Sequence, residues 1–256
     1  MKIAISGKGG VGKSTIAAIL SLELAARGER VLALDADPDA NLASALGMPD
    51  ELQRSIKTIQ NQVELIEERT GAKVGVFGQM FDLDPKVDDV ADKYATHYRG
   101  VDLLVLGAET VGGSGCACPE NAFIKALVDN LVMERNQTLV MDMEAGVEHL
   151  GRATAQSVDL MLVVVEPGKR SLDCARHIRK MAADIGLRNL KYVGSKVDGP
   201  QGVEFLAREF EEDLICCLPY SDAVRRADRD GVSPYDAMDD AFKQQVELLM
   251  DAICSK

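Results

Sequence analysis

The sequence contains no apolar run of the roughly 18–20 residues that a membrane-spanning helix needs. Its first ten residues, MKIAISGKGG, lack the pattern of a secretory signal peptide. Six cysteines in 256 residues are too few for a disulfide framework, and a reducing compartment would keep them as thiols. We therefore expect a cytoplasmic protein.

Positive charge is also scarce. The chain has 29 lysines and arginines against 41 aspartates and glutamates, which gives a formal net charge of −12. Sequence-independent binding to nucleic acid or to an anionic membrane requires a basic face. The composition therefore predicts no nucleic-acid partner and no membrane partner. The C-terminal segment 233–256 is more acidic than basic, and we expect it to cover the sheet.

Apolar segments alternate with segments of helical periodicity along almost the whole chain. The strand candidates are KIAI, RVLALD, VDLLVLG, QTLVMDM, VDLMLVVVE, LKYVGSK and DLICCLP. Such strands, separated by helices, indicate an α/β fold with a mostly parallel central sheet flanked by helices on both faces. We expect a single domain over residues 1–256. The stretch 50–71 is predicted to be helical, and KVGVFG (73–78) is a candidate strand.

The strongest motif is GKGGVGKS, residues 7–14, which fits G-x-x-x-x-G-K-[ST] between a predicted strand and a predicted helix. Backbone N–H groups of such a loop and of the helix N-terminus form a cradle for phosphate. Lys13 is expected to pair with the β- and γ-phosphates and Ser14 to hold Mg²⁺. The predicted nucleotide-binding residues of the loop are Gly7, Lys8, Gly9, Gly10, Val11, Gly12, Lys13, Ser14 and Thr15.

A second lysine, Lys8, follows the first glycine of the loop. In this feature the chain resembles the deviant Walker A ATPases, the family of MinD, ParA and the nitrogenase iron protein. The resemblance implies an α/β P-loop fold and hydrolysis of ATP to ADP and phosphate. It also implies that Lys8 contacts the nucleotide of the partner subunit in a face-to-face homodimer. Lys13, Lys8 and Asp37 are the residues to which it assigns catalytic roles.

Two further segments resemble the switches of that family. LDADPDAN (34–41) is similar to switch I, which implies that Asp37 positions the attacking water and that Asp35 lies near Mg²⁺. VMDMEAG (140–146) is similar to switch II. There the resemblance implies that Asp142 holds Mg²⁺ through water and that the Gly146 N–H senses the γ-phosphate. Together with Ser14, Asp37 and Asp142 are the expected Mg²⁺ residues.

The base-binding residues are predicted from two segments near the end of the chain. GSKVDGP is similar to the N-K-x-D that reads guanine, with Lys196 matched but Ser195 in place of asparagine. Serine offers one hydroxyl where an amide supplies both a donor and an acceptor. LPYSDAV resembles the segment that borders adenine in the family, which adds Pro219 and Tyr220. We therefore favour ATP over GTP.

The glycine-rich stretch GGSGCACPENAF carries Cys116 and Cys118, separated by one residue. Zn²⁺ and similar ions usually take four ligands, and the histidines nearest in sequence, His97 and His149, are too distant along the chain to be assigned from spacing. A two-fold dimer presents the cysteine pair twice, so we predict a four-thiolate site shared between subunits. The alternative is an incidental pair. We expect packing roles for the remaining cysteines, Cys174, Cys216, Cys217 and Cys254.

Taken together, GKGGVGKST, DADPDAN, the C-x-C loop (112–119) and VMDMEAGVEHLGRAT resemble the CooC-type accessory ATPases of nickel carbon monoxide dehydrogenase maturation. The resemblance implies a metallochaperone that binds Ni²⁺, or Zn²⁺ in its place, and serves carbon monoxide dehydrogenase or acetyl-CoA synthase. Four thiolates also suit zinc and iron–sulfur clusters, so nickel follows from the resemblance alone. A MinD- or ParA-like positioning ATPase and an iron–sulfur carrier or reductase are the alternatives.

Overall fold

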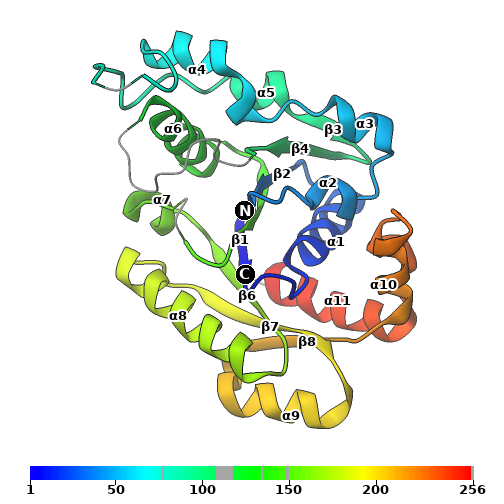
Figure 1. Cartoon of the computed structure of the whole chain (residues 1–256). Helices are drawn as coiled ribbons and strands as arrows, with labels where there is room; N and C mark the ends of the chain where they lie inside the picture. Colours follow the sequence, from blue (N-terminus) through cyan, green and yellow to red (C-terminus); the bar gives the residue numbers. More distant parts are fainter. Residues whose placement is uncertain (77, 108–117, 134, 148–149, 255–256) are drawn as a thin grey trace.

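The computed structural model describes residues 1–76, 78–107, 118–133, 135–147 and 150–254. Within these ranges the strands form one eight-stranded sheet in the order β3-β4-β2-β5-β1-β6-β7-β8 (Figure 1). Only β3 runs antiparallel to its neighbour among the paired strands, so the mostly parallel α/β fold is confirmed. The strands are β1 (Lys2–Gly7), β2 (Val31–Ala36), β3 (Thr96–Tyr98), β4 (Val101–Val105), β5 (Thr138–Met143), β6 (Leu160–Val165), β7 (Leu190–Val197) and β8 (Leu214–Pro219).

Helices cover both faces of the sheet, as the continuous apolar strands require. In Figure 1, α1, α2 and α11 lie on one side, and α6, α7 and α8 lie on the other. Because side chains alternate along a strand, Ile3 and Ile5 of β1 enter the core with α1, whereas Ala4 enters the core with α6. The α-helices are α1 (Lys13–Ala26), α2 (Leu42–Ala45), α3 (Asp50–Ser55), α4 (Val63–Thr70), α5 (Val90–Tyr94), α6 (Pro119–Met133), α7 (Arg152–Gln156), α8 (Lys169–Ile185), α9 (Gly199–Phe210), α10 (Asp222–Arg229) and α11 (Asp240–Cys254).

The predicted helix over residues 50–71 is wrong in its length. The chain forms α3, then the 3-10 turn η1 (Ile59–Asn61), then α4. Ile56 and Thr58 have extended backbones, and the Gln60 N–H donates to the Leu106 carbonyl just after β4. A tertiary hydrogen bond thus replaces the helical one, and local helix propensity is overridden.

The candidate strand at 73–78 is also wrong for its described residues, which include no strand. Gly75 and Gly78 have left-handed backbones, and Val76 is exposed. The sequence likewise did not predict β3. This edge strand joins β4 through Arg99 and Gly100, both with positive φ, as in a two-residue type I′ hairpin.

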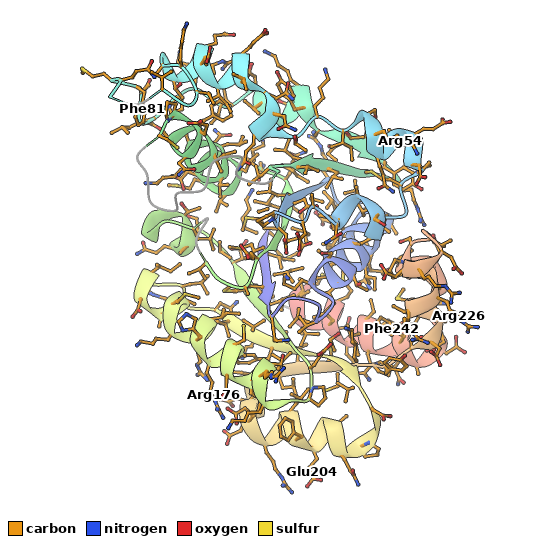
Figure 2. The ribbon with its side chains drawn as sticks, in the orientation of Figure 1. Arg54, Phe81, Arg176, Glu204, Arg226 and Phe242 are labelled. Atoms are coloured by element: carbon orange, nitrogen blue, oxygen red, sulfur yellow. The ribbon has the colours of Figure 1, made fainter. Side chains whose placement is uncertain are left out.

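The C-terminal helix packs on the sheet, as expected for the acidic tail. Phe242, which Figure 2 labels, is buried on α11 together with Val246, Leu249 and Met250. By contrast, Glu204 points outward from α9 at the margin of the molecule in Figure 2. No helix in the described part of the chain is long and apolar enough to cross a bilayer.

A buried lysine at the start of β1 fixes the C-terminal end of α6. The Lys2 ammonium donates to the carbonyls of Leu131, at 3.0 Å, of Gln137, at 3.2 Å, and of Arg135. Burial lowers the pKa of Lys2, whereas Asp159 raises it. A cation is favoured here because helix carbonyls at this end have no intrahelical donors. Strand β1 and helix α6 are therefore joined directly.

Candidate functional site

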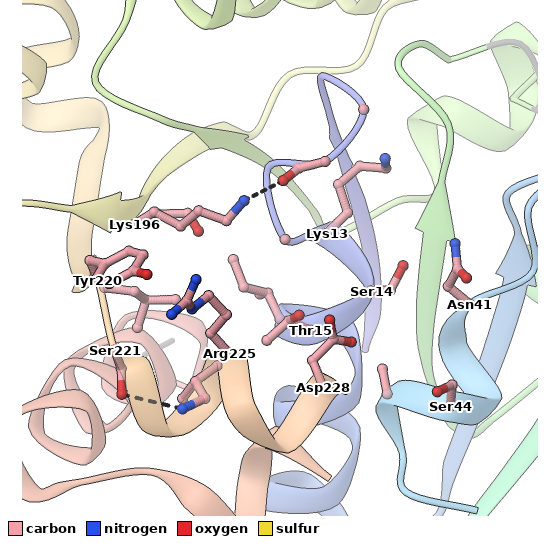
Figure 3. Close-up of a pocket in the computed structure, with 18 of the residues that line it drawn as sticks. Lys13, Ser14, Thr15, Asn41, Ser44, Lys196, Tyr220, Ser221, Arg225 and Asp228 are labelled. Carbon is pink, nitrogen blue, oxygen red and sulfur yellow. Dashed lines mark hydrogen bonds between the residues drawn. The ribbon is translucent and has the colours of Figure 1, made fainter. Parts of the chain in front are cut away.

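A cavity of about 510 Å³ opens beyond the carboxyl ends of β1, β7 and β8 (Figure 3). Ligands of open parallel sheets bind at this edge. Its lining includes predicted site residues from four segments of the sequence, namely Gly9, Gly10, Gly12, Lys13, Ser14, Thr15, Asp37, Lys196, Pro219 and Tyr220. The described lining does not include Gly7, Lys8, Val11, Asp35, Asp142 or Gly146.

The glycine loop 7–12 has the backbone that its sequence predicts. Gly10 and Gly12 both have left-handed φ values, of 80° and 98°. A Cβ added at Gly7 would lie 2.5 Å from the Val164 carbonyl oxygen, so a side chain there is excluded. Gly12 directly precedes α1. The first backbone N–H groups of a helix have no carbonyl acceptor within that helix. The loop is thus built to bind an anion at a helix N-terminus.

Lys13 and Asp37 form a buried ion pair at the floor of the site. The Lys13 Nζ lies 3.4 Å from an Asp37 carboxylate oxygen, and the two side chains are 7% and 12% exposed. The predicted phosphate-binding lysine and the predicted water-positioning carboxylate are therefore neighbours, although 24 positions separate them in sequence. Both residues line the cavity.

Two carboxylates behind this pair lie on adjacent strands. Asp35 of β2 and Asp142 of β5 are register partners, and neither is exposed to solvent. Burial, together with the Asp142 charge, raises the pKa of Asp35 to about 7. Burial raises the pKa of Asp142 to about 6, although the neighbouring Ser14 and Lys13 lower it.

The two carboxylates differ in their hydrogen bonds. Asp35 accepts the backbone N–H groups of Leu42, at 2.9 Å, and of Asp37, at 3.3 Å. Within the described part of the chain, neither carboxylate oxygen of Asp142 has a hydrogen bond of normal geometry, although the Ser14 hydroxyl lies close enough to lower its pKa. A buried carboxylate without a donor is costly unless a cation or water completes it. Asp142 therefore fits Mg²⁺, which commonly takes one or two carboxylates together with phosphate and water oxygens.

The turn after β5 is held by a hydroxyl from β1. Ser6 donates to the Glu144 carbonyl at 2.8 Å, and the Gly146 N–H lies 3.1 Å from the Ser6 oxygen. The same N–H also approaches the Glu144 carbonyl at 2.7 Å. Gly146 therefore already has acceptors within the protein.

The cavity continues toward α10, where sequence analysis found only part of the lining. The Arg225 guanidinium lies over the Tyr220 ring, 6.0 Å from its centroid (Figure 3). Among the described residues Ser195 and Lys196 line the cavity, whereas Asp198, which would complete a guanine-reading motif, does not. The lining residues to which sequence analysis gave no role of their own are Ile16, Asp39, Asn41, Ser44, Ala45, Leu218, Ser221, Val224, Arg225, Asp228 and Phe242.

Comparisons with known proteins agree with this geometry. The family model of the CobQ/CobB/MinD/ParA nucleotide binding domain matches residues 2–235. The carbon monoxide dehydrogenase accessory protein CooC of Rhodospirillum rubrum is 42% identical over 257 residues, which cover 100% of this chain and 97% of that protein. The chain belongs to the CobQ/CobB/MinD/ParA family.

One further relative and one solved structure are also similar to this chain. An ATP-binding protein of Methanocaldococcus jannaschii is 40% identical, with 89% of this chain and 88% of that protein covered. The solved structure of the MinD cell division protein of Aquifex aeolicus superimposes with a TM-score of 0.68 at 19% identity, over 100% of this chain and 98% of that one. The predicted P-loop fold and ATPase class are confirmed, as is the CooC-type resemblance within the CobQ/CobB/MinD/ParA family.

The cysteines of this family member divide into different environments. Cys116 and His149 lie outside the described residues. Cys118 is half-buried immediately before α6, and its carbonyl accepts the Ala122 N–H at 3.1 Å. His97, on the edge strand β3, pairs with Asp102. Among the described residues, no group of three or more metal-binding side chains is assembled.

The packing role predicted for the other cysteines holds only in part. Cys216 is buried on β8, and desolvation raises the pKa of its thiol to about 12. Cys217 and Cys174 are half-buried and pack against the core, where burial also raises the pKa of both thiols. Cys254 is exposed, so packing is the wrong reading for that residue. The last turn of α11 turns it outward while Ile253 faces the core.

Proposed function

We propose that this chain is an ATP-hydrolysing metallochaperone that carries Ni²⁺ at Cys116 and Cys118 and assists its insertion into carbon monoxide dehydrogenase or acetyl-CoA synthase. The 42% identity with the accessory protein CooC over the whole chain carries the proposal. The position of Cys118, next to the first turn of α6, supports it, because a loop that ends there can present thiolates to a second subunit. In this proposal the protein acts in the cytoplasm and binds neither nucleic acid nor a membrane.

The nucleotide reaction uses residues grouped around the glycine loop. Lys13 leaves its ion pair with Asp37 to bind the β- and γ-phosphates, which frees the Asp37 carboxylate to orient the attacking water. Ser14 and Asp142 hold Mg²⁺, which when bound neutralises charge on the phosphates. Asp35, whose oxygens already accept two backbone N–H groups, fixes the switch segment that carries Asp37.

In this proposal, both the nucleotide site and the metal site are completed by a second subunit of a homodimer. Lys8 is half-buried on the glycine loop, and no described carboxylate pairs with it, so its ammonium is available to the nucleotide of a second subunit. In our proposal the same two-fold axis pairs the Cys116 and Cys118 segments of the two subunits, because an isologous interface presents each segment twice. Each subunit supplies two of the four thiolates.

The test is the number of nickel ions bound per subunit at equilibrium, with the native mass measured on the same anaerobic sample. We expect one Ni²⁺ per dimer in the wild type and none in Cys116→Ala/Cys118→Ala. The matched control is Cys174→Ala/Cys254→Ala, which removes the same number of thiols from α8 and α11 and should bind nickel like the wild type.

Three results would contradict the proposal. Undiminished nickel binding by Cys116→Ala/Cys118→Ala would make the pair incidental. A monomeric nickel complex would remove the shared site. Visible absorbance from the anaerobically purified wild type, absent in the cysteine variant, would replace nickel with an iron–sulfur cluster at the same ligands. Zn²⁺ titrated in competition with Ni²⁺ shows which ion the site prefers.

A further inference from the structure

Lys196 makes two polar contacts outside its own strand. Its Nζ donates to the Gly10 carbonyl in the glycine loop at 2.5 Å, the contact drawn as a dashed line in Figure 3. The same Nζ lies 2.8 Å from a carboxylate oxygen of Glu166. The three residues follow or end the adjacent strands β1, β6 and β7. One ammonium therefore connects the carboxyl ends of three neighbouring strands.

The backbone at Lys196 is unusual for a lysine. Its φ is +53°, and the pairing of β7 with β8 shifts register between Gly194 and Val197. A left-handed conformation is unfavourable for a residue with a side chain, and such irregularities re-aim side chains next to functional sites. Here the irregularity points the lysine across β6 to the glycine loop.

The carbonyl that Lys196 binds belongs to the phosphate cradle. Across a trans peptide, the Gly10 carbonyl points opposite to the Val11 N–H, and that N–H donates to the Lys8 carbonyl at 3.3 Å. If the Gly10 carbonyl rotated inward, its oxygen would face the bound anion and repel it. The neighbouring Ser195 hydroxyl lies close to the same loop, since a Cβ placed on Gly12 would lie 3.3 Å from it.

We infer that Lys196 is a positioning residue for the phosphate loop, which it holds through Gly10 while Glu166 holds Lys196. This differs from the base-reading role that the N-K-x-D resemblance implies. Asp198, the partner that such a role requires, does not line the cavity among its described residues. The inference concerns the nucleotide site alone and is independent of which metal the protein carries.

The test measures the affinity of Mg²⁺ADP and of inorganic tripolyphosphate, a probe without a base, by calorimetry. We expect Lys196→Met to weaken both by about tenfold, which is about 1.4 kcal/mol, because the loop loses the hydrogen bond that orients its Gly10 carbonyl. Lys196→Arg should restore most of the affinity. Steady-state kinetics with ATP should show a raised KM and a kcat that changes much less, because Lys13 and Asp37 are untouched.

Glu166→Gln separates positioning from a direct phosphate contact. If Glu166 orients Lys196, this variant weakens both probes about threefold, and Lys196→Met/Glu166→Gln is no weaker than Lys196→Met alone. The matched control is Lys191→Met, which removes the similarly exposed ion pair with Asp213 elsewhere on β7 and should leave both affinities unchanged. Thermal unfolding of each variant confirms that the fold is intact.

Three outcomes would overturn the inference. The first is Lys196→Met binding both probes as tightly as Lys191→Met does. The second is a loss for Mg²⁺ADP without a loss for tripolyphosphate, which would assign Lys196 to the base or ribose. The third is tighter binding in Glu166→Gln, which would show that the lysine charge acts on phosphate directly.

Discussion

The Ser6 hydroxyl oxygen lies 3.1 Å from the amide nitrogen of Gly146, although 140 positions separate the two residues. It joins the end of β1 to the turn that follows β5. The resemblance to switch II assigns this same amide to the γ-phosphate. An amide that already has an acceptor must exchange it to bind phosphate, so Ser6 competes with the nucleotide for Gly146.

Ser6→Ala should therefore change two quantities in opposite directions. The free energy of unfolding should fall by about 1–3 kcal/mol, because buried backbone groups lose their partner. The preference for an ATP analogue over ADP should rise, because the Gly146 N–H then has one acceptor, the Glu144 carbonyl, in place of two. Ser21→Ala is the control, since Ser21 is equally buried but donates only within α1. An unchanged ATP/ADP preference in Ser6→Ala would contradict the competition.

The Lys13–Asp37 pair predicts that two substitutions at one contact have different consequences. Lys13→Ala should abolish nucleotide binding, because the phosphates lose their principal cation. Asp37→Ala should keep ATP bound and slow its hydrolysis by about tenfold or more, because only the water-positioning group is lost. Equilibrium binding and single-turnover hydrolysis separate the two effects. Normal turnover in either variant would remove that residue from the mechanism.

The Arg69–Asp89 pair predicts acid sensitivity far from the nucleotide. Arg69 donates twice to the Asp89 carboxylate, at 2.9 and 3.1 Å, and Lys93 donates to it as well. These donors lower the pKa of Asp89. A carboxylate whose folded pKa is depressed stabilises the protein above its unfolded pKa, about 4, and this contribution is lost as the pH falls below that value.

Asp89→Asn should accordingly lower the free energy of unfolding at pH 7 by about 1 kcal/mol or less, since the pair is partly exposed. The difference from the wild type should shrink as the pH falls below about 4. Urea unfolding of both proteins at pH 7 and at pH 3 measures this difference in the free energy of unfolding. Asp50→Asn is the control, because the Asp50–Arg54 pair is almost fully exposed. An equal difference at both pH values would exclude the ionised pair as its cause.

Local chemistry explains why so much of the site was predictable. The glycine loop is one continuous segment, and its left-handed glycines and following helix are encoded within eight residues. The carboxylates at 35, 37 and 142 follow or end apolar strands, and parallel strands bring those ends to one edge. Pro219 ends β8 and Tyr220 follows it, in a segment whose pattern is recognisable in the sequence, and both line the cavity.

Other parts of the site depend on contacts that sequence periodicity does not record. Lys196 contacts Gly10, which lies 186 positions away in the sequence. The contact depends on a left-handed backbone at Lys196, which could not be predicted from the residue type. Arg225 lines the cavity because α10 follows the carboxyl end of β8, whereas from the sequence alone an arginine on a solvated helix face would look the same. The helix expected at 50–71 failed for the same reason, since its break depends on a hydrogen bond to the residue after β4.

The contact of Lys2 with the last turn of α6 has a mechanical consequence. Strand β1 begins at the residue that anchors the C-terminal end of α6 and ends where the glycine loop begins. The opposite end of α6, 15 residues and about 22 Å away, carries Cys118. Phe123, Leu127 and Leu131 bury α6 in the core along its length, so the helix is a rigid connection. Strand β1 and helix α6 therefore hold the phosphate cradle and Cys118 in a fixed relation to each other.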